Sequence, residues 1–394
     1  MRLLFTSTAG TGHFHPLVPL AHAAAAAGHE VAIAASPSLG RSVDAAGLRF
    51  FPAGFDRRGR PLDDLFPRMQ SLSGPDLAAF VGVEIRLNTE ARQMVPDLLR
   101  IAQEWGPDLI IRESSEYGGC VAAEVLGLPH ASVRTAYTTS SYGQRRLVAV
   151  ALTALRAAYD LPPDPDGVSP FRYLHLAFEP PGFWPADEPQ APTAHLLCPA
   201  VWDRSGREQL PPWAACLPSR PMVCATLGTF MNRSTAVFRA ILEGLRDEPL
   251  TLILAIGRDQ DPAQFGPQPE NVHIEPYIPL SLLLPHCALV IHHAGFSTTV
   301  TALLHGLPMV LLPLGADQPL NAQRCAALGV GQVIGSDQRA AEAIRDAARA
   351  VRAEPSYRRH AERERDEMVA LPGLDHAVAL LERLVVEKQP LRPS

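Results

Sequence analysis

The sequence predicts an α/β protein of two domains, each built on a parallel sheet, and three observations support this. The chain has 394 residues, about twice the length of an ordinary domain. Near its start, an apolar strand, an alanine-rich helix and a second apolar strand follow one another. The same alternation returns after a proline-rich stretch at residues 160–221, which predicts a second domain of similar design.

The first half shows its elements through short apolar runs and helix-ending glycines. Gly28 and Gly127 each follow an apolar helical stretch, as glycine often does at helix ends. The predicted elements are, in order, strand 3–5, helix 17–27, strand 31–35, strand 108–111, helix 120–126 and strand 129–133.

The prolines of residues 160–221 predict loops and a linker, because proline interrupts both helices and sheets. Beyond this stretch, strands and helices alternate again. The predicted elements are strand 222–226, helix 235–245, strands 250–256, 272–275, 288–292 and 308–312, and a last helix at 375–387.

Composition excludes several classes of protein. The formal charge is −6, and no block of Lys or Arg stands out, so we expect small-molecule partners and no nucleic acid. The apolar runs are too short for a membrane span, which predicts no integral membrane contact. The cysteines form no C-x-x-C pair and indicate buried thiols in a reducing cytoplasm; they are Cys120, Cys198, Cys216, Cys224, Cys287 and Cys325.

The most informative segment of the second half is an apolar strand at 288–292, a turn with Gly295 and a helix running to residue 305. Ser297 is placed to cap that helix, whose first N–H groups suit a phosphate. A diphosphate could bind there without the lysine of a P-loop and without a metal. An ordinary turn with a capping serine explains the segment equally well. His292 and His293 are adjacent on a strand and point to opposite faces, so no metal site is expected.

Two stretches of the second half, HAGFST at 293–298 and HGLPMVLLPLGADQPLNA at 305–322, resemble the donor-binding signature of inverting family-one glycosyltransferases. The closest likeness is to actinomycete antibiotic and natural-product enzymes such as the calicheamicin glycosyltransferases. The resemblance extends to residues 226–229 and 277–280, and to GTGHFHP at 10–16. It implies the GT-B fold, in which two Rossmann-like domains face each other across a cleft.

The resemblance also implies which residues bind the sugar nucleotide. Tyr277 and Leu280 stand where many UDP-sugar enzymes of the family have Trp and Gln, which favours a dTDP-sugar donor. No cofactor or metal is implied. The donor-binding residues carried over are Thr229, Tyr277, His293, Gly295, Ser297, Thr298, Asp317 and Gln318.

Transfer of a sugar to a hydroxyl needs a base, and histidine suits that role near neutral pH, especially beside a carboxylate. By the resemblance the base is His13, in preference to His15, and the carboxylate is Glu113, with Glu116 as the alternative. Without the resemblance, either histidine could be a helix-entry residue, and Glu113 a solvated loop acid.

The sequence therefore predicts an inverting glycosyltransferase that moves a sugar or deoxysugar to a hydroxyl of a hydrophobic natural-product aglycone. Residues 1–205 would form the acceptor domain, with helix 375–394 crossing back onto it, and residues 206–374 the nucleotide-sugar domain. Aromatic residues within 171–184 suit either an acceptor pocket or loop packing. A sugar-nucleotide 2-epimerase and a non-catalytic auxiliary partner are the alternative functions. The sequence leaves the oligomeric state open.

Overall fold

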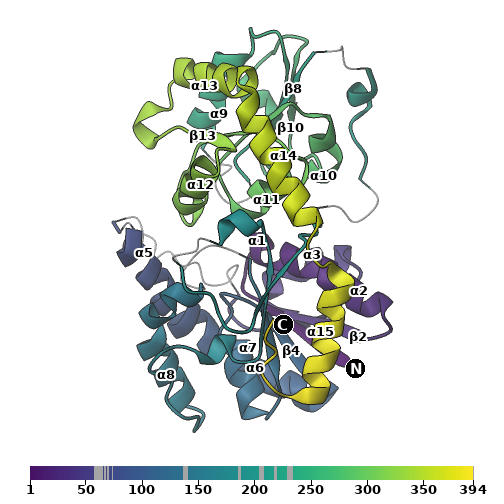
Figure 1. The fold of residues 1–394 in the computed structure, drawn as a ribbon, viewed down its shortest axis with the longest axis vertical. Helices are drawn as coiled ribbons and strands as arrows, with labels where there is room; N and C mark the ends of the chain where they lie inside the picture. Colours follow the sequence, from purple (N-terminus) through teal and green to yellow (C-terminus); the bar gives the residue numbers. More distant parts are fainter. Residues whose placement is uncertain are drawn as a thin grey trace. The chain divides into compact units, whose positions relative to one another are not determined.

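The chain folds into two compact units in the computed structural model (Figure 1). Unit 1 comprises Met1–Glu179, Trp184–Ala200 and Leu371–Ser394, and unit 2 comprises Pro180–Phe183 and Val201–Ala370. The structure describes residues 1–56, 65, 68, 71–72, 74–135, 141–184, 188–203, 208–216, 220–228 and 234–393.

Within its described residues, unit 1 contains a seven-stranded sheet in the order β3-β2-β1-β4-β5-β6-β7, with every neighbouring pair parallel. Its central strands are buried and largely apolar because helices cover both faces, and polar residues such as Thr6, Arg112 and Glu113 lie toward their carboxyl ends. The strands are β1 (Arg2–Ser7), β2 (Glu30–Ala35), β3 (Arg49–Pro52), β4 (Leu109–Glu113), β5 (His130–Val133), β6 (Leu174–Phe178) and β7 (Ala194–Leu197).

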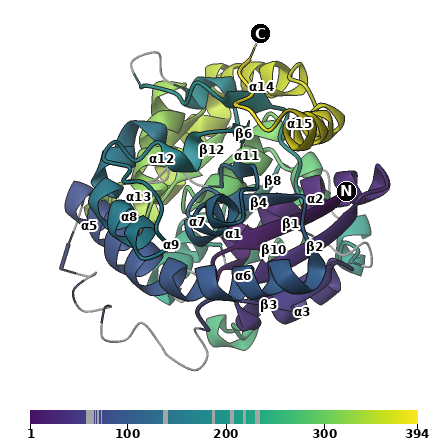
Figure 2. The same cartoon turned by 90° about the horizontal axis from the view of Figure 1, so that it is seen from below.

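The helices of unit 1 pack on both faces of this sheet. Helix α6 buries Val95, Leu98 and Ile101 against the face that presents Leu4 and Ile110, while α15 packs beside α2 on the other side (Figure 2). The helical elements are α1 (Thr11–Phe14), η1 (His15–Leu17), α2 (Val18–Ala26), η2 (Pro37–Leu39), α3 (Gly40–Ala45), α5 (Gly74–Phe80), η4 (Val81–Ala91), α6 (Arg92–Trp105), α7 (Gly118–Val125), η5 (Tyr142–Leu147), α8 (Ala149–Ala157), η6 (Ser169–Phe171) and α15 (Leu374–Glu387).

In the described part of unit 2, six parallel strands have the order β10-β9-β8-β11-β12-β13. Numbered from β8, this is the order 3-2-1-4-5-6 of the Rossmann fold. The strands are β8 (Met222–Thr226), β9 (Thr251–Ala255), β10 (Val272–Glu275), β11 (Leu289–His292), β12 (Met309–Leu311) and β13 (Gly331–Val333).

Alternating side chains of the unit 2 strands enter two separate cores. Val223 and Ala225 of β8 pack with Phe238 of α9 and Ile344 of α13, whereas Cys224 joins the opposite core. That second core includes α10, α11, α12 and α14. The helical elements are η7 (Pro181–Phe183), η8 (Pro212–Cys216), α9 (Thr235–Leu245), η9 (Pro262–Phe265), α10 (Leu280–Leu283), η10 (Leu284–His286), α11 (Phe296–Leu304), α12 (Gln318–Ala327), η11 (Ser336–Gln338), α13 (Ala341–Ala353) and α14 (Pro355–Val369).

The predicted fold class of two Rossmann-like α/β domains is confirmed. The prediction that residues 160–221 form only loops and a linker was wrong, because β6 and β7 lie within this stretch. Both strands are short segments without proline, so their N–H groups can pair in the sheet while the prolines lie outside them.

The aromatic residues of the proline-rich stretch serve packing at two positions. Phe171 is buried against Tyr142 in unit 1, with ring centroids 5.4 Å apart, and Phe183 is fully buried beside Phe296 in unit 2. For Phe171 and Phe183, these contacts favour a role in loop packing over a role in an acceptor pocket.

Two further expectations concern the cysteines and the membrane. Of the cysteines whose side chains are described, all five are free thiols, and Cys198 alone among them is not fully buried. In the described residues, no helix combines the length and apolar character needed to cross a bilayer.

Candidate active site

The predicted catalytic residues of unit 1 follow β1 and β4, the neighbouring strands at which the strand order changes direction. His13 lies in α1, directly after β1, and Glu113 is the last residue of β4. In open α/β sheets, ligands bind outside the carboxyl ends of the strands at such a point. The topology therefore brings two distant parts of the chain to the place where a site is expected.

His13 and Glu113 are in direct contact. The His13 Nδ1 atom lies 3.2 Å from Glu113 Oε2, and Nε2 lies 3.0 Å from Nη2 of Arg86. An ionised carboxylate only accepts hydrogen bonds and a guanidinium only donates them. In a neutral ring, both neighbours thus favour the same tautomer, with the proton on Nδ1 and a lone pair on Nε2.

Glu113 is fully buried and is held ionised by its surroundings. It accepts hydrogen bonds from Thr8 Oγ1 (2.8 Å), the Ser115 amide (2.7 Å) and Thr135 Oγ1 (3.0 Å). Burial alone would raise the pKa of Glu113, but His13, Arg86 and the Ser115 amide outweigh it and hold the pKa at about 2. The carboxylate is therefore available to stabilise a positive charge on the imidazole.

The loop that carries Glu113 is fixed by a buried arginine. Arg112 donates hydrogen bonds to the carbonyl oxygens of Glu113, Ser114 and Glu116 at 2.9–3.3 Å, and to that of Pro170 at 2.5 Å. A buried cation is costly unless its donors are satisfied. These carbonyls satisfy its two Nη atoms and, in return, the loop after β4 has little freedom.

Glu116, the alternative carboxylate, bonds elsewhere. It accepts hydrogen bonds from Thr6 Oγ1 at 2.5 Å and from the Gly119 amide at 2.8 Å. Burial raises the pKa of Glu116 to about 7, although these two hydrogen bonds oppose the shift. His15 lies in η1 beside Phe14, with ring centroids 6.0 Å apart. The geometry thus pairs Glu113 with His13.

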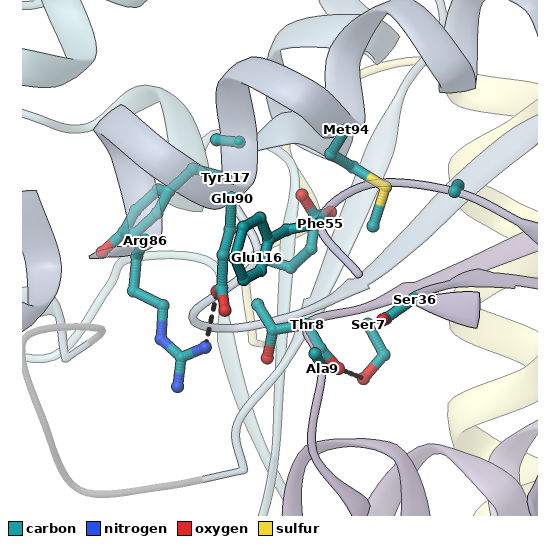
Figure 3. A pocket seen from close by; sticks show the side chains of 12 residues that line it. Ser7, Thr8, Ala9, Ser36, Phe55, Arg86, Glu90, Met94, Glu116 and Tyr117 are labelled. Atoms are coloured by element: carbon teal, nitrogen blue, oxygen red, sulfur yellow. Dashed lines mark hydrogen bonds and ion pairs between the residues drawn. The ribbon is translucent and has the colours of Figure 1, made fainter. Parts of the chain in front are cut away.

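A small recess is lined by Thr8 and Arg86, the residues that contact Glu113 and His13 (Figure 3). It has room for about one water molecule, far less than a drug-sized ligand needs. Polar and apolar side chains mix in its wall, including Arg86, Glu90, Glu116, Met94 and Phe55. The recess is therefore not a ligand pocket.

Arg86 is a site residue that the sequence did not indicate. It lies in η4, an eleven-residue π-helix, and pairs with Glu90 at 2.7 Å. π-helical turns are rare and concentrate at functional sites. Burial would lower the pKa of Arg86, but Glu90 and Glu113 raise it, so the group stays charged. No pattern in the sequence marks a change from α to π geometry.

In unit 2, the turn after β11 forms the predicted anion site, with one correction. The prediction that Ser297 caps α11 was wrong: Gly295 is the N-cap, and Ser297 is exposed inside the first turn. No side chain among the described residues caps this helix. The amides of Phe296, Ser297 and Thr298 therefore lack partners within the helix, which suits an anion.

His293 is held between two glycines. A Cβ added at Gly228 would lie 2.6 Å from the His293 ring, and one added at Gly295 would lie 2.4 Å from His293 Nε2. Burial lowers the pKa of His293 to about 4, although a hydrogen bond with the Thr226 backbone opposes this shift. The ring is therefore neutral at pH 7, and it can donate one hydrogen bond without carrying charge.

Asp317 and Gln318 lie where α12 begins, after β12, and both have partners. Gln318 Oε1 accepts from the Leu314 amide at 2.7 Å and the Gly315 amide at 3.1 Å. Asn321 donates to Asp317 Oδ2 at 2.9 Å and to the Ala294 carbonyl at 3.0 Å. Buried Asn321 thus joins this loop to the anion turn, a role that the sequence did not reveal.

Tyr277 follows β10, and its ring is covered by a cation. The Arg258 guanidinium lies 3.5 Å from the ring centroid, and the Tyr277 hydroxyl donates to the Asp203 carbonyl. Asp203 Oδ1 accepts a hydrogen bond from Ser281 Oγ at 2.6 Å, which connects the segment around Asp203 to the start of α10. Thr229, also predicted to bind the donor, lies outside the described residues.

One cluster within the described residues has the geometry of potential metal ligands: Cys120, Glu124 and His130, whose ligand atoms lie within 4.8 Å of one another. Two arginines already bind its carboxylate. Arg156 contacts both oxygens of Glu124, at 2.7 and 3.0 Å, and Arg172 lies 3.2 Å from it. These cations would oppose a metal ion, so the cluster is best described as a buried ion-pair network.

Comparison with known proteins identifies the family. The Erythromycin biosynthesis protein CIII-like N-terminal domain matches residues 22–154, and the corresponding C-terminal domain matches residues 241–384. The 10-deoxymethynolide desosaminyltransferase of Streptomyces venezuelae is 30% identical over 98% of both chains. This chain belongs to the EryCIII-like glycosyltransferases. The aklavinone 7-beta-L-rhodosaminyltransferase of Streptomyces galilaeus is also 30% identical, over 100% of this chain and 98% of its own length.

Solved structures of other glycosyltransferases share the fold. The glycosyltransferase VinC, solved in complex with dTDP, is 27% identical, with a TM-score of 0.80 over 98% of this chain and all of VinC. The calicheamicin glycosyltransferase CalG4 has a TM-score of 0.81 over 99% of both chains at 22% identity, which shows a common fold. The fold is thus GT-B, and the protein is a glycosyltransferase.

The close fit of His293 against Gly295 predicts a specific steric coupling. The backbone at Gly295 has φ −63°, which alanine adopts without strain, so Gly295→Ala should act only through the imidazole. We expect a loss of about 1–3 kcal/mol in the free energy of unfolding, as for other overpacked sites. The loss should be at least halved in a His293→Ala background, measured by chemical denaturation of the four proteins.

Gly373→Ala is the control for this cycle, because an added Cβ there meets nothing within 4 Å. It should change stability little in either background. An equal cost of Gly295→Ala with and without the imidazole would show that the ring is not the obstacle.

The raised pKa of Glu116, about 7, predicts a pH-dependent stability. The folded state holds this proton more tightly than the unfolded chain, whose Glu pKa is about 4.3. Stability is therefore lost as pH rises from about 4.5 to 7, by an amount on the order of 3 kcal/mol. Glu116→Gln cannot ionise, so its calorimetric melting temperature should fall less than that of the wild type between pH 5 and pH 8. Parallel changes in the two proteins would contradict the assignment.

Proposed function

We propose that the protein moves a deoxysugar from a dTDP-linked donor to a hydroxyl of a hydrophobic natural-product aglycone, with inversion at the anomeric carbon. His13 would be the general base, and the donor diphosphate would bind at α11 without a metal ion. The observation that carries this proposal is the contact of His13 with Glu113 at Nδ1 and with Arg86 at Nε2. Together these neighbours favour a lone pair on Nε2. The desosaminyl and rhodosaminyl transferases, similar over their whole length, support the substrate classes.

The proposed step balances as a single displacement. His13 Nε2 takes the proton of the acceptor hydroxyl while that oxygen forms a bond to the anomeric carbon. The bond from this carbon to the donor diphosphate breaks on the opposite face, which inverts the configuration. Glu113 is ionised because its pKa is about 2, and it stabilises the imidazolium that forms on His13.

The departing diphosphate gains negative charge, and the turn after β11 suits that charge. The first amides of α11 point toward such a ligand and carry the positive end of the helix dipole. Neutral His293 can donate one further hydrogen bond, and the Ser297 and Thr298 hydroxyls can add two more. Asp317 and the amide nitrogen of Gln318 are proposed to bind the sugar hydroxyls.

The two kinds of chemistry belong to different parts of the chain. The His13–Glu113 pair lies in unit 1, and the turn after β11 that suits an anion lies in unit 2. We therefore assign the acceptor to residues 1–205, together with the returning segment 375–394 that contains most of α15, and the nucleotide sugar to residues 206–374. Because the protein is a glycosyltransferase, the epimerase and auxiliary-partner interpretations do not apply.

The base assignment predicts that His13→Ala loses transfer but not nucleotide binding. General-base catalysis contributes about 100- to 10,000-fold, so kcat/KM for a hydroxyl acceptor should fall within that range. The dissociation constant for dTDP, measured by calorimetry, should stay within about twofold because the donor site lies in unit 2.

His15→Ala is the matched control, since His15 is the neighbouring histidine that lacks the Glu113 contact. It should retain most of the activity. Wild-type turnover in His13→Ala, or a larger loss in His15→Ala, would overturn the assignment of the base.

Donor preference gives a second test. Tyr277 and Leu280 replace the Trp and Gln of UDP-sugar enzymes, and VinC was solved with dTDP. Calorimetric titration should therefore show tighter binding of dTDP than of UDP. Tighter binding of UDP would contradict the proposed donor while leaving the base assignment intact.

A further inference from the structure

Arg86 contacts Nε2 of His13, the atom that the proposed reaction needs. Its Nη2 lies 3.0 Å from His13 Nε2, the nitrogen whose lone pair would take the proton of the acceptor hydroxyl. A guanidinium stays protonated at any pH in the working range, so it cannot itself accept a proton. An acceptor hydroxyl can reach Nε2 only by taking the place of this N–H group.

We propose that Arg86 is a positioning residue that donates a hydrogen bond to the Nε2 lone pair of His13 until an acceptor hydroxyl replaces it, and that its positive charge opposes protonation of the imidazole. This inference rests on the proposed role of His13 as base. Arg86 acts through His13 and is assigned no contact with the reacting atoms.

The π-helix η4 holds Arg86 in place. The Thr89 hydroxyl donates to the Glu84 carbonyl, five residues back, at 2.7 Å, and Arg86 Nη1 lies 2.7 Å from Glu90 Oε2. The side chains of Arg86 and Glu90 are only 12% and 7% exposed. An arginine buried to this degree beside a carboxylate has little freedom, so its contact with His13 is not a chance contact of a surface side chain.

Glu90 and His13 contact different nitrogens of Arg86. Glu90 binds Nη1, whereas Nη2 faces His13, and both Arg86 and Glu90 line the recess (Figure 3). Loss of the contact with Nε2 would therefore leave the ion pair with Glu90 in place. Release of His13 would not leave a buried charge without a partner.

The charges around the imidazole act in opposite directions. Glu113 at Nδ1 favours the protonated ring, whereas Arg86 at Nε2 disfavours it. Beyond these two lie Glu90, bound to Arg86, and the side chains around the loop after β4, namely Glu116, Tyr117 and Arg112. Among the residues that the structure describes, Arg86 alone has a positive group in contact with Nε2. Its removal should allow the ring to take up a proton at higher pH.

The test compares Arg86→Gln with Arg86→Lys, which keeps the charge, and with Arg92→Gln, an exposed arginine that begins the next helix. Two quantities are measured for each: the pH dependence of kcat/KM, and the midpoint of the His13 ring titration by NMR without substrates. In Arg86→Gln, the acidic limb and the ring midpoint should both move up by about one pH unit. Both should stay near the wild-type values in Arg86→Lys and Arg92→Gln.

Glu90→Gln provides a variant of opposite sign. With less negative charge beside Arg86, the guanidinium opposes ring protonation more strongly, so the acidic limb and the midpoint should move to lower pH. This measurement stands even if Arg86→Gln does not fold.

An unchanged limb and midpoint in Arg86→Gln, with activity lost equally at every pH, would show a merely structural role and overturn the inference. So would shifts of the same sign in Arg86→Gln and Glu90→Gln. If the ring midpoints shift as expected but the wild type transfers no sugar, the proposed function fails while the contact between Arg86 and His13 is confirmed.

Discussion

The contact between His13 and Glu113 is the interaction on which the rest of the site depends. Glu113 is fully buried yet ionised, because hydroxyls, an amide and nearby cations replace the water it has lost. Its charge would be costly if the imidazole did not share it. Arg112 fixes the loop after β4, so the carboxylate cannot move away from the ring. One arrangement thus satisfies both the stability of this loop and the needs of a base.

The two units use the same topology for different chemistry. In each, the strand order reverses beside the first strand, and the loops at the carboxyl ends of the two adjacent strands carry the site residues. In unit 1 these loops place a base against a buried carboxylate. In unit 2 they place a neutral histidine and uncapped helix amides together, where a diphosphate can bind. Ala294 and Ala316, in the loops after β11 and β12, have positive φ angles, which are uncommon for alanine.

The sequence predicted much of the fold, because short apolar strands alternate with helices that end in glycine. Strands β6 and β7 escaped prediction because their pairing depends on a sheet edge far away in the chain, not on their few residues. His13 and Glu113 follow from family motifs and lie together in the structure. Arg86 and Asn321 could not be predicted, since the first depends on π-helical geometry and the second on a tertiary contact. Gly295, not Ser297, ends the turn before α11, because the ring of His293 leaves no room for a larger residue there.

The most direct test of the His13–Glu113 pair is to measure which tautomer His13 adopts in the wild-type protein. Nitrogen-15 NMR of the histidine rings, with the His13 signals assigned by their absence from His13→Ala, reports which nitrogen carries the proton. Above neutral pH we expect a proton on Nδ1 and a bare Nε2, because Glu113 only accepts and Arg86 only donates. A ring protonated on Nε2 and bare on Nδ1 would contradict both contacts and, with them, the assignment of His13 as the base.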